Sequence, residues 1–120
     1  MDITRTLAEL KKDPGFAENV GMTLIHNGTV RGWSRKDRRE VKAIRVRHDY
    51  DKIESIRKEL EQNEGIYRII TEAYEGDFKP GDDVMYLIVA GDIRENVKAT
   101  LAELLDRIKS EAVTKEEIFA

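Results

Sequence analysis

The sequence contains no cysteine, only two prolines and one tryptophan, and no apolar run of about 18 residues. Without cysteine, the chain cannot form disulfides, thiolate metal sites or iron–sulfur clusters, and it has no cysteine nucleophile. Residues 1–15 lack the apolar stretch of a secretory signal. A glycine-rich phosphate loop and a GxSxG motif are also missing, which disfavours ATP, NAD and serine-hydrolase chemistry. These absences predict a soluble, cytoplasmic protein that needs no cofactor.

Positive charge is concentrated in one stretch of the sequence. The 120 residues carry a formal net charge of −3 and fit one domain, residues 1–120. Within this acidic background, five cations fall in nine residues: Arg31, Arg35, Lys36, Arg38 and Arg39. A nucleic-acid binder usually has a basic excess over its whole domain, and only Trp33 is interleaved here for base stacking, so nucleic acid is disfavoured as a partner. The stretch is either a solvated surface or a local site for an anion.

Hydrophobic spacing and turn signals predict an α+β fold with helices packed on a mostly antiparallel sheet. Two segments rich in β-branched residues, 20–31 and 41–46, are expected to pair as antiparallel strands around a cationic loop at about 32–40. Another strand is expected at 66–70. The run at 84–90 is apolar throughout, so we expect it in the middle of the sheet.

Three helices are expected from apolar residues at intervals of three and four. The first lies in residues 1–15, where it covers about 3–12, and the second covers 50–62. The third is expected to begin at Asp92 as N-cap and to run to about residue 109 or 110. Residues 110–120 are expected to form a C-terminal tail.

Among chemically active residues, the sequence offers cations rather than metal ligands. His26 and His48 have no acidic or histidine neighbour at ligand spacing, so no metal site is expected. Arg94 falls in the first turn of the last predicted helix, where free N–H groups favour an anion. Lys109 falls in its last turn, where a cation also stabilises the helix dipole.

Several short motifs, taken in order, resemble the large, catalytic subunit of molybdopterin synthase over about residues 20–119. Residues 28–31 (GTVR) repeat the Gly-x-Val-Arg motif of that family, with Gly21 in register upstream. Residues 76–82 (GDFKPGD) match its Gly-x-x-x-Pro-Gly-Asp turn. An apolar strand follows, and then a helix that begins with an arginine and ends with a lysine, Arg94 and Lys109.

The resemblance implies an α/β hammerhead fold and a homodimer that binds two copies of a small, ubiquitin-like sulfur carrier, a heterotetramer in all. It implies molybdenum cofactor biosynthesis, in which the thiocarboxylate of the carrier delivers sulfur to cyclic pyranopterin monophosphate and forms molybdopterin. The family's sulfur-transfer lysines correspond to Lys109 and, as the nearest counterpart of the second, Lys115. Binding of the pterin phosphate is expected from four arginines: Arg31, Arg38, Arg39 and Arg94.

Departures from the family pattern mark a divergent branch. Lys109 and Lys115 are six residues apart, where the family spacing is seven. Ile93 stands where the family has the histidine of a His-Arg pair, and Ala73-Tyr74 replaces a second such pair. These changes leave an alternative open, in which a catalytically impaired member binds the pterin or the carrier as a regulatory or assembly module.

Overall fold

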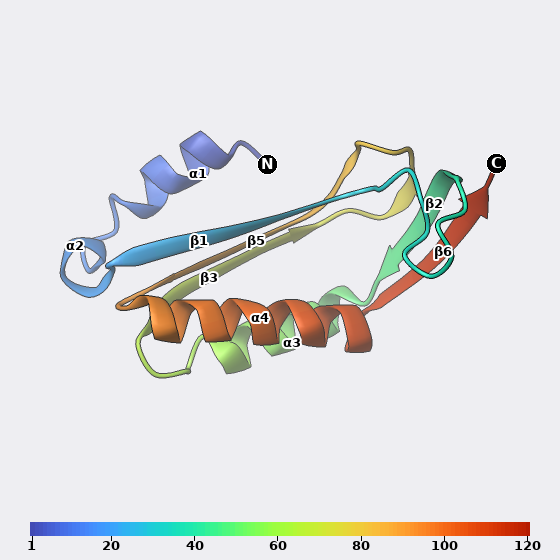
Figure 1. Ribbon diagram of the computed structural model, residues 1–120. Coiled ribbons are helices and arrows are strands. Elements are labelled where there is room, and N and C mark those ends of the chain that lie inside the picture. Colours follow the sequence, from blue (N-terminus) through green and yellow to red (C-terminus); the bar gives the residue numbers. More distant parts are fainter.

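The computed structural model describes residues 1–120 as an elongated α+β molecule of 50 × 26 × 25 Å (Figure 1). No helix is long and apolar enough to cross a membrane. Four helices and six strands follow one another in the order α1 (Ile3–Leu10), α2 (Phe16–Asn19), β1 (Met22–Thr29), β2 (Val41–His48), α3 (Tyr50–Leu60), β3 (Ile66–Ala73), β4 (Gly76–Phe78), β5 (Asp83–Gly91), α4 (Arg94–Glu111) and β6 (Val113–Phe119).

The larger sheet has the strand order β1-β5-β3, and both pairings are antiparallel. The prediction that the apolar run 84–90 lies in the middle of the sheet is therefore confirmed. One set of alternate β5 side chains joins the main core beneath the helices: Met85, Leu87 and Val89. The intervening set is also buried: Tyr86, Ile88 and Ala90. Because both faces of β5 are covered, its sequence is apolar throughout rather than alternating.

Helices α3 and α4 cover one face of this sheet, and α1 lies on its other side (Figure 1). Helix α4 is fixed by Val97, Leu104 and Ile108, all fully buried in the main core. Because these side chains recur at intervals of seven and four residues on one stripe, the helix lies flat along the sheet. Its last turn thereby reaches the end of the sheet where the second sheet begins.

The second sheet has the strand order β4-β2-β6 and is also antiparallel. The predicted pairing of 20–31 with 41–46 is wrong, because β1 pairs with β5 and β2 pairs with β4 and β6. The cationic loop therefore links two sheets rather than two neighbouring strands. A separate small core holds this second sheet together: Val30, Val41, Ile44 and Val46.

The expected C-terminal tail at 110–120 is wrong for most of its length. Residues Val113–Phe119 form β6, which pairs with β2 from Val41↔Phe119 to His48↔Val113. Only Val113, Ile118 and Phe119 of this strand are apolar, and it lies at a sheet edge. A charged edge strand gives little hydrophobic signal in the sequence, which explains the missed strand.

Two local expectations also need correction. The N-cap of α4 is Ile93, and Asp92 instead accepts hydrogen bonds on Oδ1 from the Ile93 amide and the Asn96 side chain. The predicted loop around Gly76 contains the short strand β4. The turn that follows it has Gly81 at φ 93°, a left-handed conformation that favours glycine.

Candidate functional site

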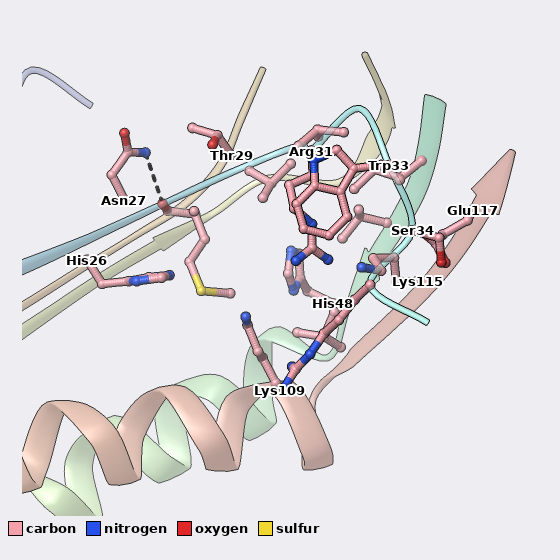
Figure 2. Close-up of a pocket in the computed structure, with 18 of the residues that line it drawn as sticks. His26, Asn27, Thr29, Arg31, Trp33, Ser34, His48, Lys109, Lys115 and Glu117 are labelled. Carbon is pink, nitrogen blue, oxygen red and sulfur yellow. Dashed lines mark hydrogen bonds between the residues drawn. The ribbon is translucent and has the colours of Figure 1, made fainter. Parts of the chain in front are cut away.

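A pocket of about 790 Å³ opens where the two sheets meet, at the C-terminal end of α4. Its walls come from β1, from the loop between β1 and β2, and from β2, β5, α4 and β6 (Figure 2). Five cations line the pocket: Arg31, Arg35, Lys36, Lys109 and Lys115. The only acidic residue in the lining is Glu117, and its carboxylate accepts a hydrogen bond of 3.0 Å from the Ser34 hydroxyl. The pocket is therefore suited to an anion.

Both predicted lysines lie in this pocket. Lys109 extends from the last turn of α4 toward β1, as Figure 2 shows. Lys115 belongs to β6, where it pairs with Val46. Helix α4 ends just before Ala112 and strand β6 begins just after it. The backbone conformation at Ala112 therefore sets the position of Lys115 relative to Lys109.

Arg31 also lines the pocket, directly after the buried Val30. The backbone of Val30 is bonded to the turn before β5, since its N–H donates to the Asp82 carbonyl and its carbonyl accepts from the Gly81 amide. The two family-like motifs, residues 28–31 and 76–82, thus meet in space. Their contact fixes the start of the cationic loop.

The other predicted arginines do not line the pocket. Arg94 begins α4, and Lys109 lies fifteen residues further along the same helix, roughly 22 Å away at 1.5 Å per residue. Arg94 is exposed and donates to Glu95 at 3.2 Å. Arg38 lies over the Trp33 ring and Arg39 over the Phe119 ring, both outside the lining. Within one copy of the chain, only three predicted residues come together: Arg31, Lys109 and Lys115.

Two histidines in the lining were not predicted as site residues. His26 lies on β1, two residues before Gly28, and a Cβ at Gly28 would lie 3.3 Å from His26 Nε2. His48 ends β2; its Nε2 lies 3.1 Å from the Tyr74 carbonyl, and its Nδ1 is buried without a partner. Strand alternation places residues 26 and 28 on the same face, which is the signal that could have pointed to His26.

Both imidazoles have lowered pKa values. Burial lowers the pKa of His26 below its ordinary value of 6.5, and the positive charge of Lys109 lowers it further. Burial also lowers the pKa of His48, although its hydrogen bond to the Tyr74 carbonyl and the nearby Glu75 oppose this effect. Both rings are therefore neutral at pH 7. His26 has a ring nitrogen available to accept a proton, whereas the Nε2 of His48 donates to the Tyr74 carbonyl and its free Nδ1 is buried. No group of three or more His, Asp or Glu side chains is placed to hold a metal ion.

These lowered values predict how stability depends on pH. Each histidine binds a proton more readily in the unfolded state than in the folded state. The neutral rings therefore contribute fully to folding stability above the unfolded pKa of about 6.5, and this contribution is lost as the pH falls through the lowered folded pKa. We expect His26→Gln to reduce the loss of stability between about pH 7.5 and about pH 5.5, as measured by urea unfolding. An equally steep loss in His26→Gln and in the unmutated protein would contradict the assignment.

Comparisons with known proteins agree with the fold. The model of the MoaE protein family matches residues 1–111. A molybdopterin synthase structure from Staphylococcus aureus is 18% identical, with a TM-score of 0.72 over 84% of this chain and 76% of that one. A MoaE structure from Burkholderia ambifaria MC40-6 is 21% identical, with a TM-score of 0.74 over 100% of this chain and 81% of that one.

A third structure, from Helicobacter pylori 26695, is described as a protein–protein complex of subunits 1 and 2 of the molybdopterin-converting factor. It is 18% identical, with a TM-score of 0.67 over 100% of this chain and 84% of that one. No curated protein matches the chain in sequence.

The fold and the pocket define the chain as a two-sheet α+β domain with a cationic pocket where its sheets meet. The family model covers all of this domain except β6 and the residue on either side of it. The chain belongs to the MoaE family, which confirms the resemblance found in the sequence.

Proposed function

We propose that this chain is the catalytic large subunit of a molybdopterin synthase. In this function it binds the thiocarboxylated end of a small sulfur carrier and catalyses transfer of the sulfur to cyclic pyranopterin monophosphate. The observation that carries the proposal is the convergence of Arg31, Lys109 and Lys115 on one pocket from the segment after β1, from α4 and from β6. Membership in the MoaE family supports the same reaction.

The charges of the pocket suit both reactants. The pterin substrate carries a phosphate, and the carrier arrives with a negatively charged thiocarboxylate at its C-terminus. Arginine offers a planar fork of donors for phosphate, so Arg31 is assigned to the phosphate. Two lysines can then stabilise the negative charge that develops during sulfur transfer, and we assign this role to Lys109 and Lys115. Neutral His26, beside Lys109, is available as a proton acceptor.

The partner in this proposal is the small carrier subunit, in a heterotetramer of two large and two small subunits. The Helicobacter pylori neighbour, a complex of subunits 1 and 2, supports such an assembly. The reaction requires no metal and no cofactor from this chain, and the cytoplasm is its proposed location. Arg94 lies too far along α4 to act in the pocket of its own copy, so we leave it outside the proposed site.

The phosphate role of Arg31 predicts a defect in substrate binding. Charge-assisted hydrogen bonds contribute about 1.5–3 kcal/mol, so Arg31→Ala is expected to raise KM for the pterin about 10- to 100-fold. Lys98→Ala removes an exposed cation of α4 that lies outside the pocket and is expected to leave KM unchanged. Steady-state assays of both variants at saturating carrier measure this difference. An unchanged KM in Arg31→Ala would remove Arg31 from the phosphate site.

A second function is favoured by one observation at the start of α4. Ile93, which replaces the family's histidine, is 53% exposed, and its neighbour Arg94 is paired with Glu95 rather than free. A chain that lacks this histidine could bind the carrier or the pterin as a regulatory or assembly module. Carrier binding without product in a reconstituted assay would favour this function over the first.

A further inference from the structure

The cationic loop, residues 32–40, is a closed and well-bonded structure. The Val41 amide donates to the Gly32 carbonyl at 2.9 Å, and Trp33 forms an isolated β-bridge with Glu40. Ser34 is only 2% exposed, and its hydroxyl binds Glu117 of β6. The loop is thus attached both to itself and to the second sheet, and the side chains it carries are held in defined places.

Trp33 lies between the pocket and the outer part of the loop. The residue is 40% exposed and lines the pocket, as does Arg31 (Figure 2). The guanidinium carbons of Arg31 and Arg38 each lie 4.7 Å from the centre of the Trp33 ring, within the range of a cation–π contact. Arg31 has no carboxylate partner, so the ring is the contact that orients its guanidinium.

Arg38 occupies a backbone conformation that glycine adopts more easily. Its φ is 62°, and it is the only residue other than glycine with a positive φ. A long side chain at a left-handed position is strained, and such positions cluster at functional sites. Arg38 forms no ion pair, and its one side-chain contact of note is with the Trp33 ring. That contact explains why the loop has arginine at this position.

We propose that Trp33 and Arg38 are positioning residues for the anion-binding guanidinium of Arg31. Trp33 provides a flat surface on which Arg31 rests, and Arg38 covers the same ring and holds its rotamer. Arginine loses considerable rotamer freedom when it binds an anion, so a guanidinium already oriented by stacking binds more tightly. This inference rests on the proposed function, because it assumes that Arg31 receives the phosphate of the pterin.

The test compares pterin binding with folding stability in variants of Arg38 and Trp33 and in a control variant. Arg38→Gly relieves the left-handed strain, so its urea midpoint should equal or exceed that of the unmutated protein. Its Kd for cyclic pyranopterin monophosphate, measured by calorimetry, should nevertheless rise about 3- to 10-fold. Trp33→Leu should weaken binding at least as much, and Trp33→Phe should retain most of the affinity because it keeps an aromatic face. Lys42→Ala, which removes an exposed cation from β2, should bind like the unmutated protein.

Each outcome decides the inference. Weaker binding of Arg38→Gly at undiminished stability supports it, because a merely structural residue would not separate the two quantities. Unchanged binding of Arg38→Gly and Trp33→Leu, while Arg31→Ala is impaired, overturns this inference and leaves the proposed function intact. A fall in the urea midpoint that parallels the loss of binding assigns Arg38 a structural role and also overturns it. An unmutated protein that does not bind the pterin overturns the proposed function and this inference together.

Discussion

Lys109→Ala is expected to reduce molybdopterin formation at least about 100-fold, since a positioned group that acts on the transition state contributes 10²–10⁴ in rate. The side chain extends from the last turn of α4 into the pocket beside His26. The loss should appear in kcat rather than in KM for the pterin, because Arg31 is assigned to hold the substrate. Single-turnover assays with thiocarboxylated carrier measure the effect directly.

The fold should survive this substitution. Lys109 is exposed and makes no ion pair, and alanine is a strong helix former, so only a weak helix-dipole contribution is lost. Lys98→Ala is the matched control, because Lys98 is an exposed lysine of the same helix outside the pocket. Lys98→Ala should react at the normal rate. A Lys109→Ala protein that also retains the normal rate would remove Lys109 from the mechanism.

Leu104→Ala is expected to lower the free energy of unfolding by about 2–5 kcal/mol, the usual cost of a cavity in a packed core. Leu104 is fully buried between α4 and the larger sheet, in the cluster that also contains Leu87 and Val89. Because domains of this size are stable by only about 5–15 kcal/mol, the variant should lose a large part of its stability. Urea unfolding followed by circular dichroism measures it.

The exposed neighbour Glu103 provides a comparison for this prediction. Its carboxylate meets only the Asn63 side chain at 3.4 Å, so Glu103→Ala should change the unfolding free energy by less than about 0.5 kcal/mol. A small effect at Leu104, comparable to that at Glu103, would contradict the packing of α4 on the sheet. That packing matters for function because it determines where the last turn of the helix presents Lys109.

Elements with strong periodicity were predictable from the sequence, and pairings between distant segments were not. The apolar run of β5 and the stripe of α4 were identified because burial leaves a direct pattern in the residues. The false pairing of β1 with β2 arose because consecutive strands usually lie side by side, whereas here β1 pairs with β5 and β2 pairs with β6, both far along the chain. Strand β6 was missed because its exposed residues are charged.

Residues of the site were predictable from the sequence only where they correspond to positions in the family motifs. Arg31 and Lys109 came from the resemblance, and the structure places both in the pocket. Arg94 could have been separated from Lys109 by helix geometry alone, since fifteen residues of one helix span roughly 22 Å. Strand alternation puts His26 on the same face as Gly28, but its proximity to Lys109 depends on the approach of α4 to β1, a contact between distant elements that the sequence pattern does not encode.

The most direct test of the central claim is reconstitution of the reaction from purified components. The assay combines this protein, a thiocarboxylated carrier from the same genome and cyclic pyranopterin monophosphate, and it detects product as the fluorescent oxidised pterin. Formation of molybdopterin by the unmutated protein, and its loss in Lys109→Ala, is the predicted result. Absence of product while the carrier still binds would contradict catalysis and identify the chain as a binding module of the MoaE family.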